Sequence, residues 1–383
     1  MTGEHGFSLV EVLIATALTL SATAVIVSVL DPARDSFRTQ TEAADMEQRL
    51  RIAGDALRRD LSMAGAGSSR GPLTGPLHGY FAPVLPRHVS DEASVAARDN
   101  AITLVYVTET PSQTSIDTAI RAESVTVAVR HEVGCPLGDV LCGFTTGQQV
   151  VVYDDAGAFS VFTVTGDTGS ALRLRHDLPD TNYVFRAGST IAAAIGHSYQ
   201  LSEDGTTGIS QLTRDDGARQ VPVVNHVVGL WFEYFGDAQP PRITTGGTVE
   251  QPRSTYGPAP TLEGAVGYPP GENCVFARDA SQQPVPRLSV LTGGGNAPIA
   301  LPLSLFEDGP WCPNAGHASR FDADLLRVRR VIARVRVQSA DASLRGPAGQ
   351  LFTQGGTARR GPEYLPDFEV SLDVSPRNLH VSQ

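Results

Sequence analysis

The sequence contains no lysine, and all 30 of its basic residues are arginine. Charged residues make up 19% of the chain, below the quarter that is typical of soluble domains. The 41 acidic residues outnumber the basic ones, which gives a formal net charge of −11 at pH 7. Because a surface of this sign repels nucleic acid, we expect no nucleic-acid partner. The use of arginine in place of lysine is as consistent with a GC-rich genome as with a function.

Motifs of common catalytic and nucleotide-binding sites are also missing. The chain has no P-loop, no G-x-G-x-x-G, no H-E-x-x-H and no C-x-x-C. His176, His197 and His226 fit ordinary positions at strand ends or in a core. Acidic residues at Asp154-Asp155, Asp204 and Asp215-Asp216 are typical of turns and lack the spacing of a calcium-binding EF-hand. We therefore expect no enzyme, no cofactor and no metal.

The longest apolar run of the chain lies near its N-terminus. Phe7 to Leu30 contains one charged residue, Glu11. As an α-helix this run would be about 36 Å long, enough to cross a ~30 Å hydrocarbon core. It exceeds the ~7–15 residues of a secretory h-region, and no A-x-A-like cleavage site follows it. A charge at the bilayer centre costs about 2.5–3.5 kcal/mol, so we expect Glu11 to have a specific role.

The run begins with Gly6-Phe7-Ser8-Leu9-Val10-Glu11. With its short leader, this motif resembles the class III signal of the type IV pilin and pseudopilin superfamily. The resemblance implies cleavage between Gly6 and Phe7 by a prepilin peptidase, followed by N-methylation of Phe7. The helix would remain as a membrane anchor and filament core. The leader, residues 1–6, departs from the usual pattern because it has no Lys or Arg and contains Glu4.

The same resemblance assigns partners and a location. The expected partners are the prepilin peptidase, a major pilin and other minor pilins. The chain would be a single-pass protein of the inner membrane with its head in the periplasm, or part of a pilus at the cell surface.

Glu11 follows Phe7 by four residues, which places it about 6 Å farther along a helix. Cleavage would leave an ammonium group on Phe7, and a carboxylate in an apolar bundle is tolerated when it is paired. The resemblance implies that Glu11 of one subunit pairs with the terminal amine of a neighbour and fixes their register. The alternative is a plain single-pass anchor whose Glu11 lies near the membrane interface.

A second helical segment is expected over residues 31–64, after a kink or break at Asp31-Pro32. It carries an amphipathic stripe formed by Met46, Leu50, Ala53, Leu57 and Leu61. Charged residues occupy the other faces: Glu47, Arg49, Arg51, Asp55, Arg58, Arg59 and Asp60. The resemblance places the stripe against the subunit's own sheet, whereas pairing with a partner helix is the alternative.

Residues 65–383 read as a β-rich head, because short strand-like segments recur at roughly 8–12-residue spacing. The fold expected is therefore α+β, with the long N-terminal helix packed on an antiparallel sheet. Residues 236–325 are rich in Gly and Pro and read as an insertion, which forms either a contact surface or a solvated loop. The predicted strands are Ala101–Val107, Ser124–Arg130, Gln149–Tyr153, Phe159–Val164, Ala171–Arg175, Thr190–Ile195, Ser198–Leu201, Gly208–Arg214, Val328–Val337 and Phe368–Val374. Val221–Phe235 is expected to form a short turn that enters a further strand.

Four cysteines lie beyond the apolar run, at Cys135, Cys142, Cys274 and Cys312. An even number there fits disulfides in an oxidising periplasm. Proximity in the sequence favours Cys135–Cys142 and Cys274–Cys312, although four cysteines allow three pairings. A zinc site is less well supported, because the cysteine spacing lacks C-x-x-C and His317 near Cys312 makes only one Cys–His pair.

The segment Val328–Val337 alternates between two faces. Arg330, Arg334 and Arg336 share one face, which we expect to be solvated or, alternatively, to dock an acidic partner. Val221–Phe235 and Val328–Leu379 look like the PilW group of minor pilins.

Taken with the N-terminus, the resemblance implies a minor pilin that assembles or primes a type IV pilus. A minor pseudopilin of a type II secretion system is the first alternative. A membrane-anchored periplasmic binding protein or enzyme is an alternative from another class.

Overall fold

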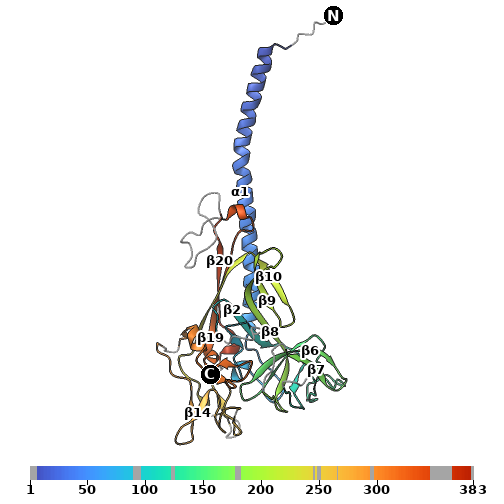
Figure 1. The fold of residues 1–383 in the computed structure, drawn as a ribbon, viewed down its shortest axis with the longest axis vertical. Helices are drawn as coiled ribbons and strands as arrows, with labels where there is room; N and C mark the ends of the chain where they lie inside the picture. The colour runs from blue at the N-terminus through green and yellow to red at the C-terminus, as the bar shows by residue number, and fades with distance from the viewer. Residues whose placement is uncertain are drawn as a thin grey trace. The chain divides into compact units, whose positions relative to one another are not determined.

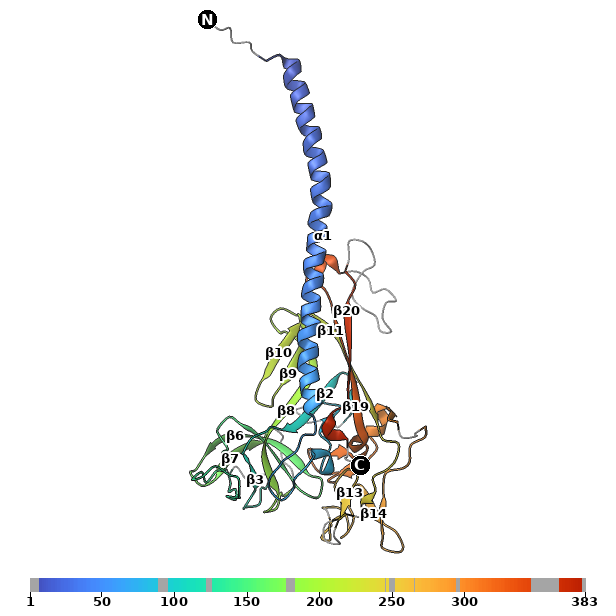
Figure 2. The same ribbon diagram turned by 180° about the vertical axis from the view of Figure 1, so that it is seen from behind.

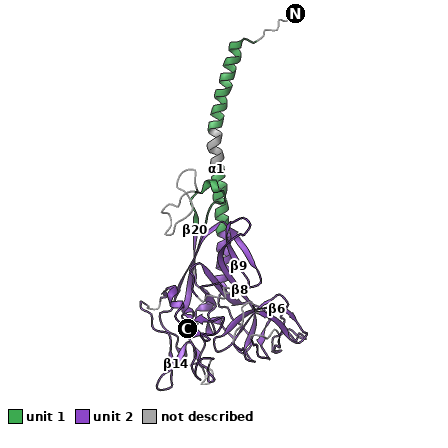
Figure 3. Cartoon of the chain, viewed as in Figure 1, with its two compact units in different colours: residues 1–50, 337–368 green, residues 51–336, 369–383 purple. Residues whose placement is uncertain are grey.

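The computed structural model describes residues 7–88, 96–121, 126–176, 183–244, 246–247, 252–264, 266–293, 297–345 and 365–380, without the side chains of 29–36 and 176. The chain divides into two compact units (Figure 3). The first comprises Met1–Leu50 and Val337–Phe368, and the second comprises Arg51–Arg336 and Glu369–Gln383.

Helix α1 runs from Leu9 to Met63 (Figures 1 and 2). Of the kink or break expected at Asp31-Pro32, the break does not occur, since the helix continues through Pro32. A proline removes a single backbone donor, and the turns on both sides keep their own hydrogen bonds. The helix ends where predicted, and Gly65 follows it with a φ of 81°. That left-handed backbone conformation favours glycine.

In the first unit, residues 338–345 lie along the middle of α1. Arg38 forms an ion pair with Asp341 at 2.5 Å, and the backbone N–H of Ala340 donates to the carboxylate of Glu42. Asp341 also precedes the short 3-10 helix η4 (Ala342–Leu344). Its carboxylate accepts a hydrogen bond from the Ser343 N–H of that helix at 2.9 Å. These polar contacts hold the segment on the helix.

The second unit contains an antiparallel ten-stranded sheet built around β8 (Thr190–Glu203). The neighbour order is β1-β2-β8-β5-β6-β7-β4, while β3 and β9 also pair with β8, and β10 pairs with β9. The segments predicted at 190–195 and 198–201 are therefore one strand. The other strands are β1 (Val84–Leu85), β2 (Ala101–Val107), β3 (Gln113–Ser115), β4 (Thr126–Val127), β5 (Gln149–Tyr153), β6 (Phe159–Asp167), β7 (Leu172–His176), β9 (Ser210–Asp215) and β10 (Gln220–Asn225).

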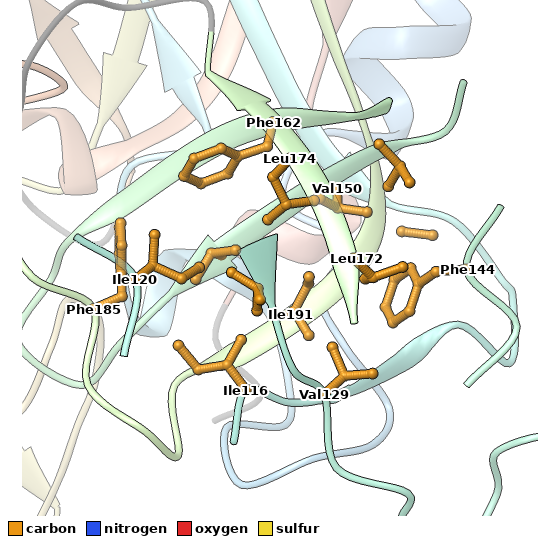
Figure 4. Close-up of a cluster of buried hydrophobic side chains, with 14 of the residues drawn as sticks. Ile116, Ile120, Val129, Phe144, Val150, Phe162, Leu172, Leu174, Phe185 and Ile191 are labelled. Atoms are coloured by element: carbon orange, nitrogen blue, oxygen red, sulfur yellow. The ribbon is translucent and has the colours of Figure 1, made fainter. Parts of the chain in front are cut away.

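One face of β5, β6, β7 and β8 covers a hydrophobic core. Its side chains include Val150, Phe162, Leu174 and Ile191, which point toward one another (Figure 4). Side chains at alternate positions of each strand point to this face. The segment around the first disulfide closes the same core, because Cys142 and Phe144 are buried in it.

A second sheet has the order β16-β11-β19-β20. Its strands are β16 (Ile299–Leu301), β11 (Val227–Gly236), β19 (Val328–Val337) and β20 (Phe368–Val374). Three two-stranded ribbons complete the unit. They pair β12 (Ile243–Thr244) with β13 (Arg253–Ser254), β14 (Phe276–Arg278) with β15 (Pro284–Pro286), and β17 (Trp311–Cys312) with β18 (Phe321–Asp322). The remaining 3-10 helices are η1 (Leu77–Gly79), η2 (Leu303–Phe306), η3 (Ala323–Arg327) and η5 (Arg377–Leu379).

The predicted α+β fold, a long helix packed on one antiparallel head sheet, is wrong. Strand makes up 33% of the chain and helix 20%, and the strands form two larger sheets and three ribbons. The apolar first part of α1 has no buried side chain, whereas Ala53, Leu57 and Leu61 are fully buried. Within the second unit these last turns contact both sheets, since Asp60 bonds to β2 and β8 and Gly54 lies against Leu372 of β20.

The Gly/Pro-rich segment 236–325 is neither a loop outside the fold nor simply solvated. It supplies β12 to β18, and β16 extends the second sheet by pairing with β11. Arg327 is fully buried and donates to the backbone carbonyls of Ala238 at 3.1 Å and Ser289 at 2.6 Å. Buried hydrogen bonds from a guanidinium therefore fasten this segment to the strand that follows it.

The arginine face of β19 is only partly solvated, because Arg330 and Arg334 are half-buried and Arg336 is buried. Arg336 is buried, stacks 4.9 Å from the ring centroid of Trp231 and pairs with Glu369. Arg330 stacks 4.2 Å from the ring centroid of Phe235. Aromatic side chains of β11 and carboxylates of the neighbouring strands therefore cover the charges that the sequence pattern assigned to solvent.

Candidate functional site

The start of α1 is a capping box formed by two residues of the candidate cleavage motif. The backbone N–H of Ser8 donates to the Glu11 carboxylate at 2.8 Å, and the N–H of Glu11 donates to Ser8 Oγ at 3.2 Å. This reciprocal pair satisfies two of the helix's otherwise unpaired donors. Phe7 lies just before the helix and its side chain is 88% exposed. Gly6, the other residue of the expected cleavage site, lies outside the described residues.

The helix that follows is long and apolar enough to cross a membrane. Leu9–Ser28 has a mean hydropathy of 2.1, and none of it is buried. Its hydroxyls are satisfied within the helix: Thr16 donates to Leu13 O at 2.9 Å and Thr19 donates to Ala15 O at 2.7 Å. Such internal bonds remove the cost of placing hydroxyls in lipid. A membrane anchor and a signal sequence both have this composition.

One side of this helix forms a shallow groove beside Glu11. Small residues create it, because Ala15 and Thr19 follow Glu11 at intervals of four and lie between larger side chains. Stripes of small residues let two helices approach closely in a membrane. The groove is lined by Phe7, Glu11, Val12, Ala15, Thr16, Thr19 and Leu20.

The structure joins both cysteine pairs that are close in sequence. Cys135 and Cys142 form one disulfide with a Cα–Cα distance of 4.5 Å, and Cys274 and Cys312 form the other at 5.1 Å. His317 is buried and T-stacked on Tyr183, with ring centroids 4.9 Å apart. Cys312 is therefore occupied by a disulfide rather than by a metal.

The aspartates of the predicted acidic turns accept hydrogen bonds from backbone N–H groups of the same turns. Asp204 Oδ1 accepts from the N–H groups of Thr206 and Thr207, and Asp216 Oδ1 accepts from those of Ala218 and Arg219. This arrangement is the usual one for Asp in a tight turn.

Asp154 makes the same kind of turn inside the core. Its Oδ1 accepts from the N–H groups of Ala156 and Ala158, and the Tyr183 hydroxyl donates to its other oxygen. Burial outweighs these hydrogen bonds and raises the pKa of Asp154 to about 6.

A buried polar cluster that the sequence pattern did not predict surrounds Asp60. Its carboxylate accepts from His197 Nδ1 at 2.6 Å, from Tyr199 at 2.6 Å and from Tyr106 at 3.1 Å. Burial raises the pKa of Asp60, but these hydrogen bonds and the charge of His197 outweigh it, so the pKa lies below the ordinary 3.8. The sequence pattern assigns Asp60 to an exposed face because its partners lie 137 and 139 residues away in the sequence.

His226 lies in the turn before β11, with a φ of 60°.

A second unpredicted cluster contains Asp308, Asp322 and Asp324, whose carboxylate oxygens lie within 4.8 Å of one another. Asp322 accepts from the N–H groups of Gly309 and Asp324, and Arg327 pairs with Asp324. Burial and the charges of Asp324 and Asp308 raise the pKa of Asp322 to about 7. Hydrogen bonds and an ion pair within the protein satisfy the two buried carboxylates, those of Asp322 and Asp324, so we assign no ion to the cluster. The D-x-D spacing at residues 322–324 is the sequence signal that points to this cluster.

The chain also contains one nucleophile pattern that was not predicted. Gly67-Ser68-Ser69-Arg70-Gly71 matches G-x-S-x-G, but it follows a helix rather than a strand, and the Ser69 hydroxyl donates to Gln113 Oε1 at 3.1 Å. A hydrolase elbow requires a strand-to-helix turn, so this match does not identify a catalytic serine.

Comparison with known proteins gives no relative: no family model, no curated protein and no solved structure matches the chain. The geometry defines an N-terminal apolar helix of membrane-spanning length followed by a disulfide-containing, strand-rich unit.

Proposed function

We propose that this protein is a minor pilin-like subunit that acts in the assembly of a type IV pilus. The observation that carries the proposal is the exposed apolar helix Leu9–Ser28 with one carboxylate, Glu11, four residues after Phe7. A charge at this position is costly in lipid unless it has a partner, and cleavage before Phe7 would create an ammonium partner.

The rest of the chain supports the same proposal. The groove beside Glu11 offers a neighbouring apolar helix a close approach through Ala15 and Thr19. The two disulfides suit a head in an oxidising compartment. In this function the helix assembles, the head is presented outside the membrane, and no reaction is catalysed.

Glu11 must change partners for this proposal to work. In the uncut chain its carboxylate is held by the Ser8 N–H. In the assembled filament it pairs with the terminal ammonium of a neighbouring subunit, because an ion pair in an apolar environment is stronger than a hydrogen bond to a neutral amide.

The test is incorporation into filaments. Glu11→Ala is expected to insert into the membrane normally but to be at least tenfold depleted from sheared filaments. Glu47→Ala removes an equal charge from an exposed position of the same helix and is the matched control. Normal incorporation of Glu11→Ala would contradict the proposed pairing.

A further inference from the structure

The two disulfides differ in how completely the protein covers them. Of the four cysteines, Cys135 keeps 9% of its surface exposed, whereas the other three are 0% exposed. Val133 before it and Leu137 after it are fully exposed, so the chain around Cys135 faces solvent. The rate of thiol–disulfide exchange depends on the access of the attacking thiolate to a sulfur atom. The disulfide between Cys135 and Cys142 is therefore the more accessible of the two.

A guanidinium group lies beside Cys135. Arg70 donates a hydrogen bond to the carbonyl of Gly134, the residue that precedes Cys135. Gly134 has a φ of 112°, and its lack of a side chain leaves room for the guanidinium. The acidic side chain nearest in sequence, that of Glu132, accepts from the Ser115 hydroxyl. Because a neighbouring cation favours the thiolate form of a cysteine, Arg70 stabilises Cys135 when the disulfide is open.

Cys142 lies in a different environment. It is buried in the hydrophobic core, and its Sγ lies 3.8 Å from the carbonyl oxygen of Gln113 and 3.9 Å from that of Pro111. After reduction, a thiol at this position can donate its S–H to either carbonyl. A thiolate would instead be desolvated and would face the lone pairs of both oxygens. The environment therefore favours a protonated thiol at Cys142 and a reactive thiolate at Cys135.

The loop between the two cysteines has hydrogen bonds that do not depend on the S–S bond. The Asp139 carboxylate accepts from the N–H groups of Leu141 and Gly143, each at 2.8 Å. The N–H of Cys135 donates to the carbonyl of Glu132 at 3.1 Å, and Leu141 packs against the hydrophobic core. These contacts keep the two sulfurs close after reduction. Two groups held close together react with each other readily, so the disulfide can close again.

From these observations we propose that Cys135 is a site of reversible thiol–disulfide exchange with a low-molecular-weight thiol, whereas Cys274–Cys312 is a permanent crosslink. The thiolate of the small thiol attacks Cys135 Sγ and forms a mixed disulfide with it. The Cys135–Cys142 bond breaks, its electron pair goes to Cys142 Sγ, and this sulfur takes a proton from water. In the reverse step Cys142 loses that proton, attacks Cys135 Sγ and releases the small thiol. The proposal does not depend on cleavage at Gly6-Phe7.

The first test compares the two disulfides in the full, unsubstituted chain in detergent micelles. Reduced glutathione is added at neutral pH, samples are alkylated at intervals, and peptide mass spectrometry measures the opening of each bond. We expect Cys135–Cys142 to open about tenfold faster than Cys274–Cys312, because exchange follows access to the sulfur. Equal rates, or faster opening of Cys274–Cys312, would overturn the proposal.

The second test identifies the sulfur that reacts. With oxidised glutathione, the Cys142→Ser chain should form a mixed disulfide at Cys135. The Cys135→Ser chain should leave Cys142 unmodified over the same time, because Cys142 is fully buried. Modification of Cys142 at an equal rate would contradict the assignment. The first test uses the unsubstituted chain, so the proposal stays testable even where one of these variants does not fold.

The role of Arg70 has its own test. Arg70→Met in the Cys142→Ser chain should slow mixed-disulfide formation about threefold, because the smaller thiolate fraction is only partly offset by a more nucleophilic thiolate. Arg186→Met removes an exposed arginine that pairs with Glu263 and is the matched control. An equal rate for the Arg70→Met and Arg186→Met chains would show that Arg70 does not activate Cys135.

Discussion

The carboxylate of Asp60, near the end of α1, accepts a 2.6 Å hydrogen bond from the hydroxyl of Tyr199 in β8. The same carboxylate accepts from His197 and Tyr106, so one buried acidic side chain joins the last turns of the helix to two strands of the larger sheet. A carboxylate with three donors is well satisfied, whereas the donors are costly to bury without it.

Asp60→Ala should therefore destabilise the protein by about 3–5 kcal/mol, because it leaves His197, Tyr199 and Tyr106 without their buried acceptor. Denaturant unfolding of the full chain in detergent measures this change. Asp55→Ala is the matched control, since Asp55 is exposed on the same helix. A loss for Asp60→Ala no larger than that for Asp55→Ala would show that the cluster does not stabilise the fold.

The lowered pKa of Asp60 also predicts how the free energy of unfolding changes at acid pH. Because the folded-state pKa is below the unfolded value of 3.8, its stabilisation is present above that value and is lost as the pH falls through the folded pKa. The difference in unfolding free energy between the unsubstituted chain and Asp60→Asn should therefore shrink below about pH 4. A difference that stays constant down to the acid transition would contradict this assignment.

Asp154 should show the opposite pH dependence. Its pKa is raised from 3.8 to about 6, so its contribution is fully present below 3.8 and is lost as the pH rises toward 6. Relative to Asp154→Asn, the unsubstituted chain should lose about 1.4 kcal/mol per pH unit across this window. Asp204→Asn, in an exposed turn of similar geometry, should not remove that slope.

Arg327 is predicted to hold the segment 236–325 in place. Arg327→Met should cost about 3–5 kcal/mol, because it leaves Asp324 buried without its cation and several carbonyls without a donor. It should also speed limited proteolysis between β12 and β18. Arg334→Met, on the half-exposed face of β19, is the control. Equal proteolysis rates for the two variants would refute this role.

The disulfides should differ in their effect on stability. On the chain-entropy model, Cys274–Cys312 contributes about 4 kcal/mol and Cys135–Cys142 about 2.5 kcal/mol, because the first closes the longer loop. Paired Cys→Ala substitutions followed by denaturant unfolding measure both values. The reverse order would show that strain or residual structure outweighs loop length.

Much of the local structure was predictable, because it depends on neighbouring residues. The turn residues Asp154 to Gly157 between Gln149–Tyr153 and Phe159–Val164 predict the hairpin of β5 and β6, and proximity predicts both disulfides. The sequence pattern predicts a gap between two strands at Gly196-His197, whereas pairing with β2 and β9 makes β8 one strand. Two sheets rather than one, the burial of Asp60 and the stacking of Arg336 on Trp231 all depend on partners distant in sequence.

The candidate site also has features that depend on neighbouring residues and features that depend on distant ones. The helix and Glu11 follow from the local pattern alone. The hydrogen bond from the Ser8 N–H to the Glu11 carboxylate is a capping-box pattern, S-x-x-E, that the sequence contains but that was read only as part of a cleavage motif. The exposure of Val133 and Leu137 could not be predicted, because it depends on how the core closes beneath them.

The most direct test of the proposed function is the mass of the protein's N-terminus. The chain should be co-expressed with an active prepilin peptidase and, as a control, with a catalytically inactive one. The account predicts loss of Met1–Gly6 and one added methyl group on Phe7 only with the active peptidase. An intact N-terminus in the presence of the active enzyme would contradict it.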